Sequence, residues 1–138
     1  MHSRDVAYGD VGPRSVGIQR DGEALLADFS CARSPCAHDT ATREACMALA
    51  ATLVDAKNHQ CQAPEVASLK PGGPPVDARA DVYAFGNWAH LVATGTPPRH
   101  GVESALPGRL AALLREALEV SVDARPDAAT LLAKCQLL

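Results

Sequence analysis

The chain has 138 residues, of which 47% are hydrophobic and 21% charged, and its formal net charge is −3. This length supports one domain with a modest core, and the composition is typical of a globular protein rather than a disordered one. The small negative charge, without a run of Lys or Arg, excludes a basic nucleic-acid groove and an anionic-membrane surface. No apolar run approaches the roughly 18 residues that span a bilayer. We therefore expect no nucleic-acid partner and no membrane partner.

The cysteines and the first few residues set the expected compartment. Five cysteines cannot all pair within one chain, and residues 1–5 lack the apolar core of a secretory signal. We expect an intracellular, cytoplasmic protein. One stretch is rich in potential metal ligands: Cys31, Cys36, His38, Cys46, His59 and Cys61. Their spacing contains no tight C-x-x-C pair, so we expect buried free thiols and no metal site.

The first predicted element is a β-hairpin near the N-terminus. Two short apolar stretches, at 16–18 and 24–27, flank the pair Asp21-Gly22. An Asp-Gly pair readily adopts the positive φ angles that a tight turn requires. The sequence therefore predicts two short antiparallel strands joined at this pair.

Helices are predicted further along the chain from apolar periodicity and from residues that start or stop a helix. The expected ranges are 40–54, 81 to about 94, 107 onward and 126 onward. Apolar residues spread around most of the circumference of the helix at 81–94, which predicts burial in the middle of the domain. On that helix we expect Trp88 in the core and His90 in an internal hydrogen bond. The fold class is therefore mainly α, with a small N-terminal hairpin.

Short motifs follow one another in a fixed order: Y-G-D-V-G-P-R-S at 8–15, A-D-F-S at 27–30, A-P-E at 63–65, D-V-Y-A-F-G at 81–86 and R-P at 125–126. In this order, and with Asp28 18 positions after Asp10, they resemble landmarks of the C-terminal lobe of eukaryotic-type protein kinases. The resemblance covers nearly the whole chain. It implies one truncated, kinase-like C-lobe over 1–138, with the N-lobe absent.

The same resemblance divides the chain into three parts. A degenerate catalytic loop, the hairpin and a D-F-G-like segment occupy 8–30. An activation-segment-like region occupies 31–65, and a helical core occupies 81–138. Architectural roles are implied at four positions: Glu65 pairs with Arg125, Asp81 holds backbone amides of the catalytic loop, and Phe29 is the aromatic residue of the D-F-G-like segment.

The resemblance also assigns catalytic positions. Asp10 stands at the catalytic-base position, and Asp28 and Ser15 stand at the two magnesium positions. Phosphoryl transfer in kinases depends on positioning and on neutralising phosphate charge with metal ions and Lys side chains. Here Gly9 and Gly12 stand where the kinase loop has Arg and Lys, Ser15 replaces Asn, and no glycine-rich loop precedes residue 8. These replacements favour an inactive loop.

Three functions are compatible with these residues. The first is a non-catalytic, pseudokinase-like domain that acts through protein–protein contacts and needs no cofactor. Its partner would be another protein chain, or a second copy, bound over the lobe surface that the missing elements would cover. The second is a serine/threonine kinase that uses Mg-ATP and receives its N-lobe from elsewhere. The third is a decayed kinase fragment without function.

Overall fold

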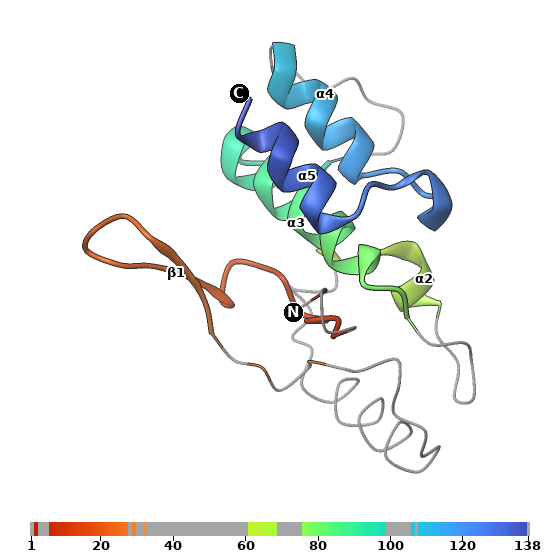
Figure 1. Ribbon diagram of the computed structural model, residues 1–138, viewed down its shortest axis with the longest axis horizontal. Helices are drawn as coiled ribbons and strands as arrows, with labels where there is room; N and C mark the ends of the chain where they lie inside the picture. Colours follow the sequence, from red (N-terminus) through yellow and green to blue (C-terminus); the bar gives the residue numbers. More distant parts are fainter. Residues whose placement is uncertain are drawn as a thin grey trace.

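The computed structural model describes residues 2, 6–27, 29, 32, 61–68, 76–98, 106 and 108–137. In chain order the described elements are β1 (Val16–Ile18), β2 (Ala24–Leu26), α2 (Pro64–Ala67), α3 (Arg79–Thr94), α4 (Gly108–Ala117), the 3-10 helix η4 (Val122–Ala124) and α5 (Ala128–Cys135). The described part is mainly helical with one antiparallel hairpin, as the sequence predicts. Figure 1 shows α3, α4 and α5 packed together, with the hairpin extending away from them at the left of the view. The helix predicted at 40–54 lies outside the described residues.

The hairpin forms where the sequence predicts it. Val16 lies opposite Leu26 in the antiparallel register. The Gln19 N–H donates to the Glu23 carbonyl at 2.8 Å and closes the turn. Within this turn Gly22 has a φ of 89°, a left-handed conformation that glycine adopts at little cost. The Asp-Gly pair therefore fixes both the position of the turn and the pairing of the strands.

Helix α3 begins slightly before its predicted start and ends where the sequence predicts. The Asp77 carboxylate accepts the Arg79 N–H at 2.8 Å, which moves the first turn ahead of Asp81. At the other end Gly95 has a φ of 73° and its N–H donates to the Leu91 carbonyl at 2.8 Å, so the helix stops at a left-handed cap. At 16 residues α3 is the longest described helix, and no helix in the described ranges is long and apolar enough to cross a membrane.

The main core lies between α3, α4 and α5. Its buried members are Val82, Leu113, Leu114, Ala117 and Leu131. Gly86 allows α3 to approach α4 closely, because a Cβ at that position would lie 3.0 Å from the Cβ of Ala117. The close contact of these helices therefore depends on the missing side chain at Gly86.

The prediction that α3 is buried on all sides is wrong for its C-terminal half. Val92 is exposed, and Trp88 is only half-buried, with its ring centroid 6.2 Å from that of Phe85. Within the described part, α3 makes its main helix contacts with α4 and α5, which cover one face. His90 is buried, and its Nδ1 lies 3.0 Å from the Thr96 carbonyl oxygen, in agreement with the predicted internal hydrogen bond.

Candidate functional site

The loop at 8–15 is attached to the first turn of α3 by the buried carboxylate of Asp81. Tyr8 donates its backbone N–H to Oδ2 at 2.6 Å, and Gly9 donates its own to Oδ1 at 2.7 Å. A buried charge is tolerated only when hydrogen bonds replace its contacts with water. Both oxygens of Asp81 receive such a bond, so the amide contacts predicted for this residue are present. They fix the backbone immediately before Asp10.

Asp10 is partly exposed and lines a small cavity together with Cys61, Gln62 and Asp81. The cavity volume is about 20 Å³, which admits a water molecule rather than a nucleotide. Burial raises the pKa of the Cys61 thiol, and the negative charge of Asp10 raises it further. The thiol therefore stays protonated and is a poor nucleophile. Beside Asp10 the structure places a protonated thiol and a small cavity with a mainly apolar lining.

Ser15, at a predicted magnesium position, is turned toward the backbone of its own loop. Its hydroxyl accepts the Gly12 N–H at 2.8 Å and donates to the Gly12 carbonyl at 3.0 Å. A serine hydroxyl has one donor and two acceptor sites, so its donor and one acceptor are in use. Ser15 is only 1% exposed. One acceptor site of the hydroxyl remains, but it is covered by the burial of the side chain, so a metal ion would reach it only if the loop moved.

The other predicted magnesium residue, Asp28, lies outside the described residues, but its neighbours are placed. Phe29 packs edge-on against Tyr8, with ring centroids 5.3 Å apart and planes at 87°. The Tyr8 hydroxyl donates to the Ala27 carbonyl. Edge-to-face packing is a favourable arrangement of aromatic rings. Together with the hydrogen bond, it holds the segment after the hairpin against the loop.

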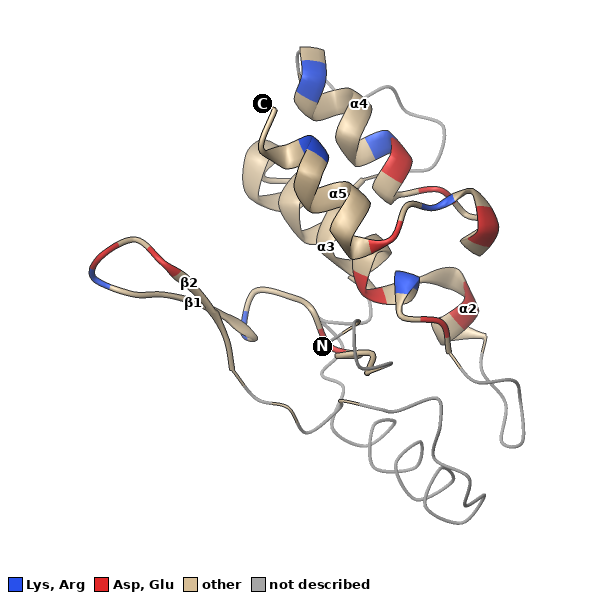
Figure 2. Ribbon diagram, in the orientation of Figure 1, with Lys and Arg blue, Asp and Glu red and all other residues tan. Residues whose placement is uncertain are grey.

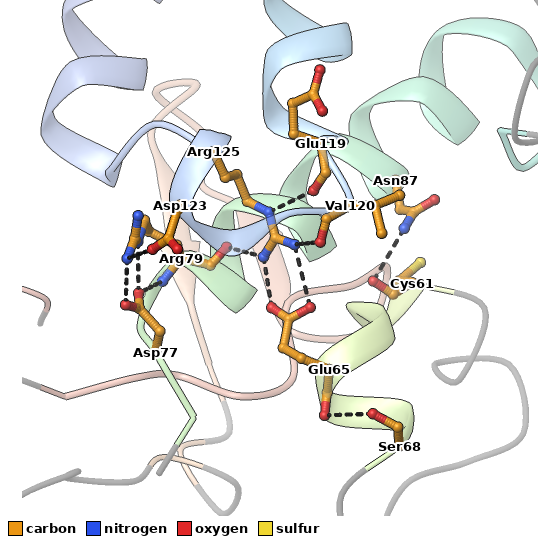
Figure 3. A network of polar contacts seen from close by, with 10 residues as sticks. All are labelled: Cys61, Glu65, Ser68, Asp77, Arg79, Asn87, Glu119, Val120, Asp123 and Arg125. Atoms are coloured by element: carbon orange, nitrogen blue, oxygen red, sulfur yellow. Dashed lines mark hydrogen bonds and ion pairs between the residues drawn. The ribbon is translucent and has the colours of Figure 1, made fainter. Parts of the chain in front are cut away.

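The predicted ion pair between Glu65 of α2 and Arg125 is present. Arg125 donates through one terminal nitrogen to Oε1 at 2.7 Å and through the other to Oε2 at 3.3 Å (Figure 3). This fork geometry matches the two oxygens of a carboxylate and is among the strong hydrogen-bond arrangements. The side chain of Arg125 is 0% exposed, whereas that of Glu65 is 25% exposed. The pair is therefore buried on the arginine side and borders solvent on the glutamate side.

Arg125 also binds three backbone carbonyls around it. It donates to Glu119 at 3.0 Å, to Arg79 at 2.9 Å and to Val120 at 3.4 Å, as Figure 3 shows. The guanidinium carbon lies 4.9 Å from the ring centroid of Tyr83, close enough for a cation–π contact. One side chain thus joins α2, the start of α3 and the segment after α4.

Of the Cys and His residues that cluster at 31–61 in the sequence, only Cys61 lies in the described part of the chain. Within that part, no three His, Cys, Asp or Glu side chains gather as a metal site. The other five residues lie outside it, so the absence of a metal site in this stretch stays a prediction.

Comparison with known proteins points to bacterial protein kinases. A 100-residue part of the chain, 72% of its length, is 31% identical to the probable serine/threonine-protein kinase PknB of Corynebacterium glutamicum. A match of the same extent is 32% identical to a probable serine/threonine-protein kinase of Corynebacterium efficiens. No protein-family model matches the chain. The matched part is 14% of the length of each relative, so the chain contains a kinase-like region that corresponds to a small part of these proteins.

Proposed function

We propose that the chain is a non-catalytic, kinase-like domain that acts through contacts with other proteins. The observation that carries this proposal is a contrast within the loop and its supports. Asp81 and Arg125, which hold the scaffold, are buried and bound by several hydrogen bonds. Ser15, which stands at a metal position, uses its hydroxyl to close its own loop.

The donors available in the loop support the same proposal. Phosphoryl transfer needs cationic groups or free N–H donors around the phosphates. Gly9 and Gly12 carry no side chain, and their amides are already bound, the first to Asp81 and the second to Ser15. Losing one contact that stabilises a transition state commonly costs about 2.7–4 kcal/mol. The bond from Gly9 to Asp81 is the scaffold contact that the kinase resemblance implies, so the loss concerns Gly12: its amide is bound to Ser15, and no cationic side chain stands at this position.

The surface proposed for contacts is the hairpin patch, which we define as Ile18 and Leu26 on one face of the hairpin, Leu25 on its other face, and Phe29 just after it. These side chains are 43–68% exposed, and they are four of the eight strongly exposed large apolar side chains in the described part of the chain. Figure 2 shows charged residues at the turn of the hairpin and none along its two strands. Exposed apolar patches mark interaction sites, and a hairpin without cover is only marginally stable in water. The proposed partner is another protein chain or a second copy, on the hairpin rather than on α3.

Nucleotide titration followed by thermal unfolding tests the catalytic half of the proposal. A site with micromolar affinity would add about 4 kcal/mol of stability at millimolar ATP, which a melting curve detects easily. We expect no shift with ATP, with or without magnesium. A magnesium-dependent rise in Tm that disappears in Asp10→Ala would contradict the proposal.

Light scattering over a wide concentration range tests whether the chain binds a second copy of itself, since association depends on concentration. We expect any association to be lost in Ile18→Asp and kept in Leu132→Asp. The control variant places the same charge at an exposed apolar position on α5, away from the hairpin patch. Equal effects of the two variants on association would contradict the assignment of the hairpin patch as the contact surface.

The second candidate function is a serine/threonine kinase that uses Mg-ATP. The similarity to probable serine/threonine-protein kinases favours it. It predicts a nucleotide-dependent rise in Tm when magnesium is present. The non-catalytic proposal predicts no such rise.

A further inference from the structure

The Asp81 carboxylate has a third donor that comes from far away in the sequence. Nε2 of His2 lies 2.9 Å from Oδ2, the oxygen that also accepts the Tyr8 N–H. An ionised carboxylate only accepts hydrogen bonds, so the shared proton belongs to Nε2. The His2 side chain is 25% exposed, and that of Asp81 is 7% exposed. The contact therefore lies at the edge of a nearly buried charge.

The three donors serve different parts of the chain. Tyr8 and Gly9 offer amides of the loop itself, whereas His2 belongs to the segment that leads into it. A carboxylate offers about four acceptor positions, and hydrogen bonds to a charged group are stronger than those between neutral groups. If the donor at His2 is removed, Oδ2 keeps one bond in a site with little access to water. The remaining amides then hold a less satisfied charge, and the loop opens more easily.

We infer that His2, Asp81 and the amides of Tyr8 and Gly9 form a latch in which His2 is a positioning residue for the loop that carries Asp10. The latch connects the segment before the loop, the loop and the first turn of α3. It works through geometry alone, so it holds whether or not the loop takes part in phosphoryl transfer. The inference therefore stands apart from the proposed function.

Amide hydrogen exchange of the full chain, read by NMR at Tyr8 and Gly9, tests the latch. In His2→Leu we expect exchange at both amides to be faster by roughly tenfold, the size expected when a hydrogen bond to a charged group is lost. His2→Gln retains a side-chain N–H donor and should restore most of the protection. Arg109→Leu is the control, because it removes an exposed hydrogen bond to the Leu137 carbonyl on the helical side.

Two further measurements distinguish opening of the latch from a general loss of stability. The Leu114 amide in the core should keep its protection in His2→Leu, and His2→Leu should add little when Asp81 is already replaced by Asn. Unchanged exchange at Gly9 in His2→Leu would overturn the inference. Equal acceleration at Gly9 and Leu114 would overturn it too. If His2→Leu does not fold, His2→Gln provides the test. This variant keeps a side-chain N–H donor, so faster exchange at Tyr8 and Gly9 in it would contradict the role of His2 as a hydrogen-bond donor.

Discussion

The helical part at 76–137 and the loop with its hairpin at 6–29 are stabilised in opposite ways. Between α3, α4 and α5, apolar side chains such as Leu114 and Ala117 are almost completely buried. In the hairpin the large apolar side chains are exposed, and the adjoining loop is attached through hydrogen bonds to Asp81. The helical part is therefore held by an apolar core, while the loop combines hydrogen bonds to Asp81 with the buried side chains of Ala7 and Tyr8.

Arg125→Ala should break the helical part most severely. The change removes the bidentate pair with Glu65, three bonds to carbonyls and the contact with Tyr83. Breaking a fully buried pair from one side costs roughly 3–5 kcal/mol, and because the Glu65 carboxylate left behind is 25% exposed, we expect a loss toward the lower end of this range. The stability of a typical domain is about 5–15 kcal/mol. Chemical denaturation of the variant and of the wild type measures the difference.

Two variants sharpen this result. Arg125→Lys keeps the charge but loses the fork, so it should still be clearly destabilising. Arg79→Ala removes an exposed pair with Asp77 and should cost about 0–1 kcal/mol. Arg125→Ala with a loss no larger than that of Arg79→Ala would mean that the buried network contributes little.

A matched pair of leucine truncations compares the two regions directly. Leu114→Ala should cost about 2–5 kcal/mol, because it opens a cavity in a core where the side chain is 2% exposed. Leu25→Ala should stay within about 0.5 kcal/mol, as is usual for exposed positions. Urea denaturation of both variants gives the comparison. Similar losses would show that the hairpin is packed against something as firmly as the helices are.

The places where the elements turn and end could be predicted from the sequence, because their signals are local. Asp21-Gly22 dictates a turn wherever it lies, and Gly95 ends α3 through its backbone alone. Burial is not local. Whether Val92 and Trp88 are covered depends on which helices reach the last turns of α3, and apolar periodicity does not contain that information.

Gly86→Val and Gly17→Val form a second matched pair. At Gly86 an added Cβ alone would lie 3.0–3.3 Å from Ala117 and Leu118, and overpacking of this kind costs about 1–3 kcal/mol. At Gly17 nothing lies within 4 Å of an added Cβ, and valine favours strands, so the change should be neutral or slightly stabilising. Thermal unfolding distinguishes them. A harmless valine at Gly86 would mean that α3 and α4 separate without cost.

The candidate site could be predicted only where a motif matched a known landmark. The contacts of Asp81 with the loop and of Glu65 with Arg125 were expected on that basis. The closure of Ser15 on Gly12 depends on a side-chain rotamer, and the contact of His2 with Asp81 joins residues 79 apart in sequence. Neither has a spacing signal, so only the structure reveals them.

Asp127→Ala should have the smallest effect, and that effect should depend on pH. The Thr130 N–H donates to Oδ1 at 2.7 Å at the start of α5, and this bond holds the pKa of Asp127 below its usual range. The Asp127 carboxylate, which caps the start of α5, therefore stabilises the fold at pH values above its ordinary pKa of about 3.9. This contribution is lost as the pH falls through the lower pKa that Asp127 has in the folded state.

Urea denaturation of wild type and Asp127→Ala at neutral and at strongly acid pH follows this change. The small difference at neutral pH should vanish in acid. Asp127→Asn, which caps a helix without titrating, should remain close to the wild type at neutral pH. A difference that grows in acid would contradict the sign of the pKa shift.

The central claim is that the domain keeps the kinase-like scaffold but does not catalyse phosphoryl transfer. Transfer of the γ-phosphate from labelled ATP, with magnesium present, tests it most directly. The reaction is followed into the chain itself and into generic protein substrates, for the wild type and for Asp10→Ala. We expect both proteins to give the same background, because Gly12 offers no cationic side chain, its amide is bound to Ser15, and Ser15 closes its own loop. Magnesium-dependent incorporation in the wild type that disappears in Asp10→Ala would contradict the non-catalytic assignment.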